Sequence, residues 1–195
     1  LIIMATQLFS DSVLSWFKSN GRKNLPWQVE ATSYKVWVSE IMLQQTQVST
    51  VIPYFNRFIK NIPDLEILAN FENRKLIKLW EGLGYYSRVR NLKKTALLVI
   101  KKFDKKLPRN YSDLKSLPGI GDYTASAISA IAFNKRIIPL DGNIERVLKR
   151  YLYLKKENEI NKENLTEKKK IFGYSNRASD YAQALMELGA LICKQ

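Results

Sequence analysis

Histidine is absent from the 195-residue sequence, and cysteine occurs once, as Cys193. The absence of histidine excludes a histidine general base, histidine-containing catalytic triads and most zinc sites. A single cysteine excludes disulfides within the chain and is typical of a reducing compartment, so we expect a cytoplasmic protein. Acid–base chemistry must therefore come from carboxylates, lysines or tyrosines.

Long apolar runs are missing too. None approaches the roughly 18 residues of a membrane-spanning helix, so we expect no membrane partner. Apolar residues still make up 46% of the chain, which predicts a globular protein with a core.

Acidic residues are outnumbered, with 18 Asp and Glu against 32 Lys and Arg and a formal net charge of +14. Such a basic chain needs an anionic partner, and nucleic acid is the main candidate. Charge is dense in residues 155–179, which include the run Glu167-Lys168-Lys169-Lys170. Runs of this kind are usually solvated, so we expect a polar connection there and not a binding site.

Strand alternation is nearly absent, and helical spacing dominates the sequence. Apolar residues recur at i, i+3, i+4 and i+7 in the segments Val48–Ile59, Tyr86–Ile100 and Tyr181–Ile192. A further helix is expected over about residues 7–19, ending at Asn20-Gly21. The pattern predicts an all-α fold.

The segment Leu117-Pro118-Gly119-Ile120-Gly121 predicts a tight hairpin between two helices. Pro118 ends the incoming helix, and Gly119 and Gly121 allow a positive φ that brings backbone N–H groups to the surface. The run Tyr123–Phe133 is expected to be a buried helix that begins at this hairpin. Exposed N–H groups at a helix N-terminus bind phosphate without reading base sequence. Taken alone, however, Pro-Gly-x-Gly is often only a turn.

Two carboxyl groups are candidates for chemistry. Asp141 precedes Gly142-Asn143, where an aspartate is more often an N-cap than a catalyst. Glu40 is the only acid of a helix expected over about residues 34–44, which is apolar nearly all round and should be buried. Burial would raise the pKa of Glu40 and keep a proton available near neutral pH. A place on one exposed stripe is as plausible from the pattern alone, although the amides of Gln44–Gln47 favour a role at nucleobase edges.

Together these motifs resemble the helix-hairpin-helix DNA glycosylase superfamily, and within it the adenine DNA glycosylases of the MutY family. The similar segments are Leu25–Trp27, Tyr34–Thr46, Gly82–Arg88 and Leu140–Asn143. The resemblance implies base-excision repair of double-stranded DNA, with hydrolysis of the N-glycosidic bond of adenine mispaired with 8-oxoguanine or guanine. We expect a monomer.

The resemblance also implies the helix-hairpin-helix glycosylase architecture. One domain, residues 27–135, would be a six-helix barrel with the hairpin motif at about 107–133. Residues 1–26 and 136–195 would form a second helical domain, incomplete at its C-terminal end. DNA would lie across the cleft, with the two candidate carboxyl groups facing each other.

Position by position, the resemblance gives Glu40 the role of protonating the adenine ring. Asp141 would stabilise or trap the sugar cation, and Tyr123 and Asn143 would support the site. A protonated carboxyl at the base and an ionised one at the sugar divide the work of breaking an N-glycosidic bond. Bifunctional members such as endonuclease III carry a lysine just after the hairpin, whose amine attacks the sugar. Tyr123 cannot form an imine, so we expect a monofunctional glycosylase.

The remaining predicted contacts are with the flipped base and the DNA backbone. The residues expected to line the adenine pocket are Lys23, Leu25, Trp27, Leu43, Val48 and Gln183. Gln45 and Tyr85 would enter the duplex beside the opposite base, while Gly119 and Gly121 would hold the backbone. Core packing is the alternative for Tyr85, and we retain it for Tyr86.

Cys193 matches the first of four cysteines that hold a [4Fe–4S] cluster in the resembled family. One thiolate cannot hold such a cluster, so we expect the sequence to stop before the other ligands and the family's C-terminal domain. Two other functions stay open. A non-catalytic helix-hairpin-helix DNA-binding fragment would need neither Glu40 nor Asp141, and an endonuclease III-type pyrimidine-damage glycosylase is disfavoured by Tyr123.

Overall fold

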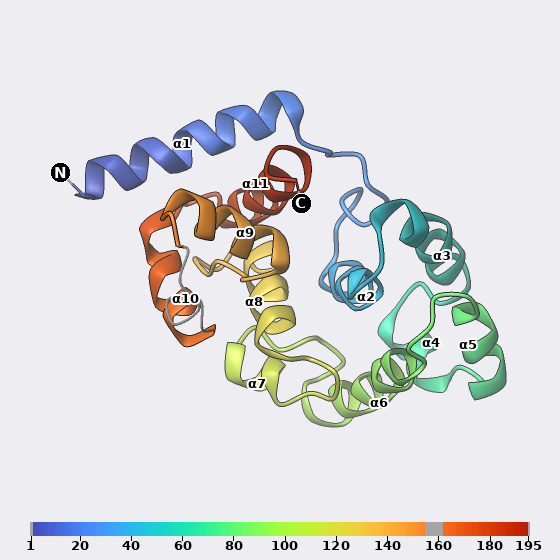
Figure 1. Ribbon diagram of the computed structural model, residues 1–195. Helices are drawn as coiled ribbons and strands as arrows, with labels where there is room; N and C mark the ends of the chain where they lie inside the picture. The colour runs from blue at the N-terminus through green and yellow to red at the C-terminus, as the bar shows by residue number, and fades with distance from the viewer. Residues whose placement is uncertain (1, 155–161, 195) are drawn as a thin grey trace. The chain divides into compact units, whose positions relative to one another are not determined.

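The computed structural model describes residues 2–154 and 162–194, and every regular element among them is helical, which confirms the all-α prediction (Figure 1). The chain forms two compact units. One is Asn24–Ile128, and the other joins Leu1–Lys23 to Ser129–Gln195. The division expected from the sequence placed these limits at residues 27 and 135 instead.

The unit Asn24–Ile128 is built from consecutive short helices. They are α2 (Ser33–Leu43), α3 (Val48–Asn61), α4 (Leu65–Asn70), α5 (Asn73–Trp80), α6 (Ser87–Lys102), α7 (Tyr111–Lys115) and most of α8 (Asp122–Ile131). Helix α6 contacts α2, α4 and α5, and α3 contacts α2 and α5. Aromatic rings fill the space between them, with Trp27 edge-on to Phe55 at 5.4 Å and Phe58 edge-on to Trp80 at 6.2 Å.

Helix α2 lies in the interior of this unit, as its sequence predicts. Thr32 caps its N-terminus by accepting a 3.2 Å hydrogen bond from the backbone N–H of Lys35. Eight of its eleven residues are buried, and the hydroxyl of Tyr34 donates to the backbone carbonyl of Ile62 at 2.9 Å. A helix that is apolar on nearly every side can be stable only when other elements surround it.

The second unit contains the elements nearest both ends of the chain. These are α1 (Ile2–Asn20), the end of α8, α9 (Gly142–Tyr151), α10 (Lys162–Lys168), the 3₁₀ helix η2 (Lys169–Phe172) and α11 (Ala178–Leu191). Helix α11 packs against α1 and α9. Phe17, Leu148, Phe172 and Leu185 are among the buried residues of their shared core.

The charge-rich segment 155–179 departs from its predicted role as a solvated connection. Residues 155–161 lie outside the described residues, but residues 162–172 form α10 and η2, and Leu165 and Phe172 are buried in the core. The ring of Phe172 stacks on Phe9, with centroids 5.2 Å apart. Two apolar side chains at a spacing of seven are enough to anchor the segment, although the lysines between them dominate its composition.

No helix among the described residues is long and apolar enough to cross a lipid bilayer.

Candidate active site

Glu40 is 5% exposed on α2, so its place on an exposed stripe is excluded. The hydroxyl of Tyr123, in the first turn of α8, donates a hydrogen bond of 2.7 Å to Oε2 of Glu40. A buried carboxyl group is stable only with polar partners, and this bond also fixes its orientation. The structure thus brings together two residues that were predicted for one site from positions 83 residues apart.

Two neighbouring glutamines follow α2, and their side chains lie in different environments. Gln44 is turned inward, and its Nε2 donates to the hydroxyl of Thr124 on α8 at 3.3 Å. Gln45 is exposed and adopts a φ of 56°, in the left-handed region that few non-glycine residues occupy. Gln45 is therefore open to solvent, and its entry into the duplex stays a prediction.

Tyr85 projects from a turn that needs its glycines. Gly82 has a φ of 97°, and a Cβ atom there would lie 2.1 Å from the hydroxyl of Tyr54. Tyr85 follows with a φ of 47° and is 62% exposed. Tyr86 is 37% exposed, so its retained assignment to the core is wrong. Its place at the N-cap of α6 leaves it at the surface.

The predicted hairpin joins α7 to α8. Gly119 has a φ of 78°, and Thr95 of α6 donates its hydroxyl to the carbonyl of Pro118 at 2.9 Å. Gly121 does not adopt a positive φ, contrary to expectation. Its carbonyl accepts the 2.9 Å bond from the backbone N–H of Ala125, so the helix already begins there. Only Gly119 therefore needs the left-handed conformation.

A carboxylate and a lysine, Asp122 and Lys115, lie at the N-terminus of α8. Asp122 accepts hydrogen bonds from the hydroxyl of Tyr111 at 2.8 Å and from Nζ of Lys115 at 2.7 Å. The lysine compensates a carboxylate that would otherwise repel an approaching phosphate. The backbone contacts of Gly119 and Gly121 with DNA stay a prediction.

Asp141, in the other unit, is the N-cap of α9. Its Oδ1 accepts from the backbone N–H of Ile144 at 2.7 Å, and its Oδ2 accepts from Nδ2 of Asn143 at 2.9 Å. Burial raises the pKa of Asp141, an effect opposed by these hydrogen bonds and by the charge of Arg146. The N-cap alternative is therefore correct, and it leaves further lone pairs on the same carboxylate for chemistry.

The predicted pocket residues are divided between the two units. In the unit Asn24–Ile128, Trp27 is buried, whereas the other three are half-buried, namely Leu25, Leu43 and Val48. In the other unit, Lys23 is exposed and directs Nζ to the backbone carbonyl of Lys18. Gln183, on α11, donates to the carbonyl of Ser179 at 3.2 Å. The pocket itself stays a prediction.

Sequence reasoning missed a half-buried ion pair beside Lys23. Glu187 of α11 receives Nε of Arg22 at 2.9 and 3.0 Å and NH2 at 2.7 Å. This bidentate pair ties the segment after α1 to α11. No periodicity in the sequence indicates it, because the partners are 165 residues apart.

The chain does not fit a [4Fe–4S] cluster. Its one cysteine, Cys193, is half-buried, and no group of three or more metal-ligating side chains occurs in the described part of the chain. Such a cluster is held by four thiolates.

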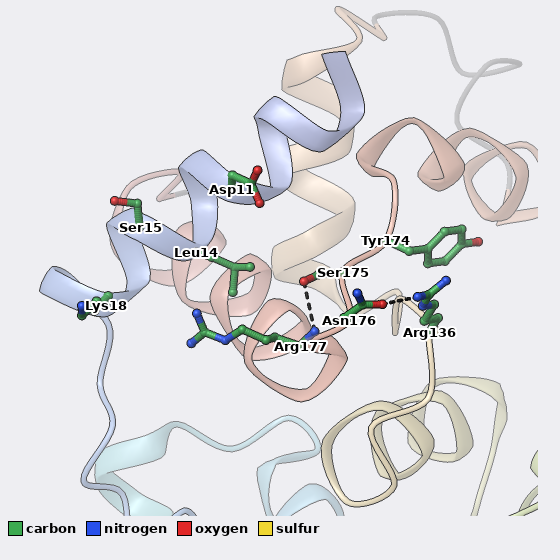
Figure 2. A pocket seen from close by; sticks show the side chains of 9 residues that line it. All are labelled: Asp11, Leu14, Ser15, Lys18, Arg136, Tyr174, Ser175, Asn176 and Arg177. Atoms are coloured by element: carbon green, nitrogen blue, oxygen red, sulfur yellow. Dashed lines mark hydrogen bonds between the residues drawn. The ribbon is translucent and has the colours of Figure 1, made fainter. Parts of the chain in front are cut away.

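A hollow of about 540 Å³ lies in the second unit, and Figure 2 shows its lining. The lining residues are Asp11, Leu14, Ser15, Lys18, Arg136, Tyr174, Ser175, Asn176 and Arg177. Both arginines have partners, since Arg136 donates to Asn176 and Arg177 pairs with Asp180 at 2.7 Å. None of the predicted site residues lines this hollow.

Similarity to known proteins agrees with the predicted family. Residues 38–172 match the family described as HhH-GPD superfamily base excision DNA repair protein. The adenine DNA glycosylase of Buchnera aphidicola subsp. Baizongia pistaciae (strain Bp) is 44% identical over 190 residues, which are 97% of this chain and 54% of that protein. The adenine DNA glycosylase of Mus musculus is 40% identical, over 95% of this chain and 38% of that protein. The chain thus spans about half the length of the bacterial relative.

Solved structures share the fold at lower sequence identity. A thermostable thymine-DNA glycosylase superposes with a TM-score of 0.84 at 24% identity, over 98% of this chain and 88% of its own. Endonuclease III in a non-covalent complex with DNA gives 0.80 at 18% identity, over 96% and 86%. These likenesses confirm the helix-hairpin-helix glycosylase fold. Because the family match spans most of the sequence, the chain belongs to the HhH-GPD superfamily of base excision DNA repair proteins.

Proposed function

We propose that the chain carries the catalytic part of a monofunctional adenine DNA glycosylase, acting as a monomer on double-stranded DNA. Its substrate is adenine mispaired with 8-oxoguanine or guanine. The observation that carries the proposal is the buried Glu40 with the hydroxyl of Tyr123 bonded to it. The names of the relatives, adenine DNA glycosylases from bacteria and mammals, support the choice of base.

The reaction breaks the bond between C1′ of the deoxyribose and N9 of adenine. Glu40 donates a proton to the adenine ring, so that the base leaves as a neutral molecule. Asp141 faces the oxocarbenium-like sugar as a carboxylate and stabilises its positive charge. Water then adds to C1′ and loses a proton, leaving an abasic site and an intact strand.

The proposed roles agree with the surroundings of each group. Glu40 lies among buried apolar residues of α2, and the Tyr123 hydroxyl fixes the orientation of its carboxyl group, as a positioned general acid requires. Burial raises the pKa of Asp141, and the N–H groups of α9, the amide of Asn143 and the charge of Arg146 oppose that rise, so they help to keep the carboxylate that faces the cation. Both carboxyl groups must act on one nucleoside.

Adenine must leave the duplex before either carboxyl group can reach it. Flipping a base costs a few kcal/mol, which contacts with the vacated stack can offset. Gln45 and Tyr85 are exposed at two turns of the same unit and are the proposed wedges. The net charge of +14 supplies long-range attraction to the phosphates.

Tyr123 supports hydrolysis over lyase chemistry. A phenol cannot form a Schiff base with the opened sugar, whereas an amine at that position could. The structural likeness to endonuclease III concerns the fold alone and carries no argument for its chemistry.

Single-turnover excision on a panel of duplexes tests the proposal. The panel holds A:8-oxoguanine, A:G, T:G and thymine glycol:A pairs, each with and without alkali after the reaction. We expect excision of adenine from the first two only, with strand breaks only after alkali. Excision of a pyrimidine would support the alternative glycosylase. Binding to all four without excision would support a non-catalytic DNA-binding fragment.

A further inference from the structure

Arg88, the second residue of α6, is buried, and its guanidinium donates hydrogen bonds to backbone carbonyls. Its NH1 donates to the carbonyls of Ile41, Met42 and Gln44 at 3.1, 3.1 and 2.7 Å. Its NH2 donates to those of Leu83 and Gly84 at 2.9 and 3.4 Å. An arginine in a strongly basic chain would ordinarily be assigned to a phosphate, but this one faces inward.

The five carbonyls belong to two separate segments. One is the end of α2, where the last carbonyls of a helix lack partners within the helix. The other is the turn that begins at Gly82. The planar guanidinium can donate in two directions at once, which a lysine ammonium on a flexible stem cannot reproduce. Arg88 is therefore a cross-link between the end of α2 and this turn.

Each segment continues directly into a strained residue. Gln45 follows the held carbonyl of Gln44 with a φ of 56°, and Tyr85 follows that of Gly84 with a φ of 47°. Non-glycine residues persist in this region only when their surroundings hold them there, and such residues cluster at functional sites. The guanidinium of Arg88 thus holds the backbone carbonyl that precedes each of these two strained residues.

Further contacts tie Arg88 to the Tyr85 side of this cross-link. The guanidinium carbon lies 5.4 Å from the ring centroid of Tyr85 and 5.5 Å from that of Trp80. Nε1 of Trp80 donates to the carbonyl of Gly84 at 3.1 Å, and the backbone N–H of Arg88 donates to the carbonyl of Tyr85 at 2.9 Å. The ring of Tyr85 therefore packs against the guanidinium of Arg88, and the rest of the ring stays exposed.

We propose that Arg88 is a positioning residue that holds Gln45 and Tyr85 in one fixed relationship, so that the two wedges enter the duplex as a unit. The inference rests on the proposed function, which makes these residues wedges. It differs from a phosphate-contact role, because Arg88 acts through the two segments without touching DNA.

The first test measures amide hydrogen exchange in the free protein and requires no enzymatic activity. Arg88→Met and Arg88→Lys should speed exchange at the amides of Thr46 and Leu83, which close the two turns. Loss of buried hydrogen bonds to a charged donor corresponds to a change of about 10- to 100-fold. Because the cross-link is shared, both segments should change together. Faster exchange in only one of them would overturn the proposal.

Lys93 supplies a matched control on the same helix. Its Nζ donates to the carbonyl of Phe71 and to Oδ1 of Asn73 at 2.7 Å, between α4 and α5. Lys93→Met removes a comparable cation from α6 and should speed exchange near residues 71–76 while leaving Thr46 and Leu83 unchanged.

The second test follows entry into DNA. The duplex carries 2-aminopurine beside 8-oxoguanine and a 2′-fluoro adenosine that resists hydrolysis, so the fluorescence rise reports unstacking apart from excision. Arg88→Met should lose most of the rise that the wild type and Lys93→Met show. In a Gln45→Ala/Tyr85→Ala background, Arg88→Met should cause no further loss, because coupled residues are not additive.

Two outcomes would overturn the proposal: full unstacking by a folded Arg88→Met protein, or an equal loss in the wedge-free background. Failure of the proposed function would give a result that can be told apart from failure of the role of Arg88. In that case the wild type excises no adenine, whereas the exchange and unstacking results still decide whether Arg88 couples the two segments.

Discussion

The hydroxyl of Tyr123 and Oε2 of Glu40 are 2.7 Å apart, and this hydrogen bond joins α8 to α2. Helix α8 begins at the hairpin whose N–H groups are proposed to hold the DNA backbone. The same helix therefore links that hairpin directly to the proposed general acid. A phosphate held at one end of this connection would have a defined relation to the carboxyl group at the other.

Tyr123 is expected to decide between hydrolysis and lyase chemistry. Tyr123→Lys places an amine near the sugar, so borohydride should trap a covalent enzyme–DNA complex that the wild type does not form. Tyr123→Phe is the control, since it lacks both the hydroxyl and an amine and should give no trapped complex. Gel analysis of borohydride-treated reactions measures this. Efficient trapping by the wild type, abolished by replacing some other lysine, would contradict the assignment.

The ionised form of Asp141, which the proposed reaction needs, is expected to lower the stability of the folded protein. Since burial raises its pKa, the folded state keeps a proton that the unfolded chain has released, between the ordinary and the raised value. Its contribution to the free energy of unfolding therefore falls as pH rises through that window. Asp141→Asn keeps the N-cap and removes this titration. We expect the variant to be at least as stable as the wild type at pH 7 and to lack that pH dependence.

Urea unfolding of the wild type and Asp141→Asn between pH 4 and pH 7 measures this difference. Asp141→Ala is the control, because it loses the N-cap and should be less stable than Asp141→Asn by about 0.5–2 kcal/mol. An Asn variant as unstable as the Ala variant would show that the cap does not survive the change.

The hairpin should depend on one glycine more than on the other. At Gly119, with a φ of 78°, a Cβ atom would lie 2.9 Å from Cβ of Asn91, whereas nothing lies within 4 Å at Gly121. Gly119→Ala should lower the free energy of unfolding by about 1–3 kcal/mol and weaken duplex binding. Gly121→Ala should change stability by less than about 1 kcal/mol. Thermal unfolding and fluorescence anisotropy measure both, and equal effects would refute the assignment of the left-handed turn to Gly119.

Phosphate contacts should dominate affinity for DNA. The logarithm of the binding constant should fall linearly with that of the salt concentration, at about −0.9 for each phosphate contacted in B-DNA. Matched and mispaired duplexes should share this slope, since phosphates carry no sequence information. Anisotropy titrations over a range of salt concentrations test this. A flat dependence would exclude the proposed backbone contacts.

Periodicity and composition predicted the helices, because side-chain pattern determines which faces a helix must hide. For Glu40 the pattern left burial and an exposed stripe equally plausible, and only the structure shows that it is buried. Periodicity and composition failed for Leu165 and Phe172, whose apolar spacing is concealed by neighbouring charges. They failed again for Arg88, whose acceptors are backbone carbonyls and leave no trace in residue types. The strain at Gln45 and Tyr85 was equally invisible, because a positive φ is expected of glycine and not of glutamine or tyrosine.

The central claim is that Glu40 is the general acid for adenine release, and Glu40→Gln tests it most directly. The amide keeps the size of the side chain and an oxygen for the hydroxyl of Tyr123, but it cannot supply the proton. Single-turnover excision from an A:8-oxoguanine duplex should fall by about 10²- to 10⁴-fold, with duplex affinity nearly unchanged. Excision by the folded variant at the wild-type rate would contradict the account.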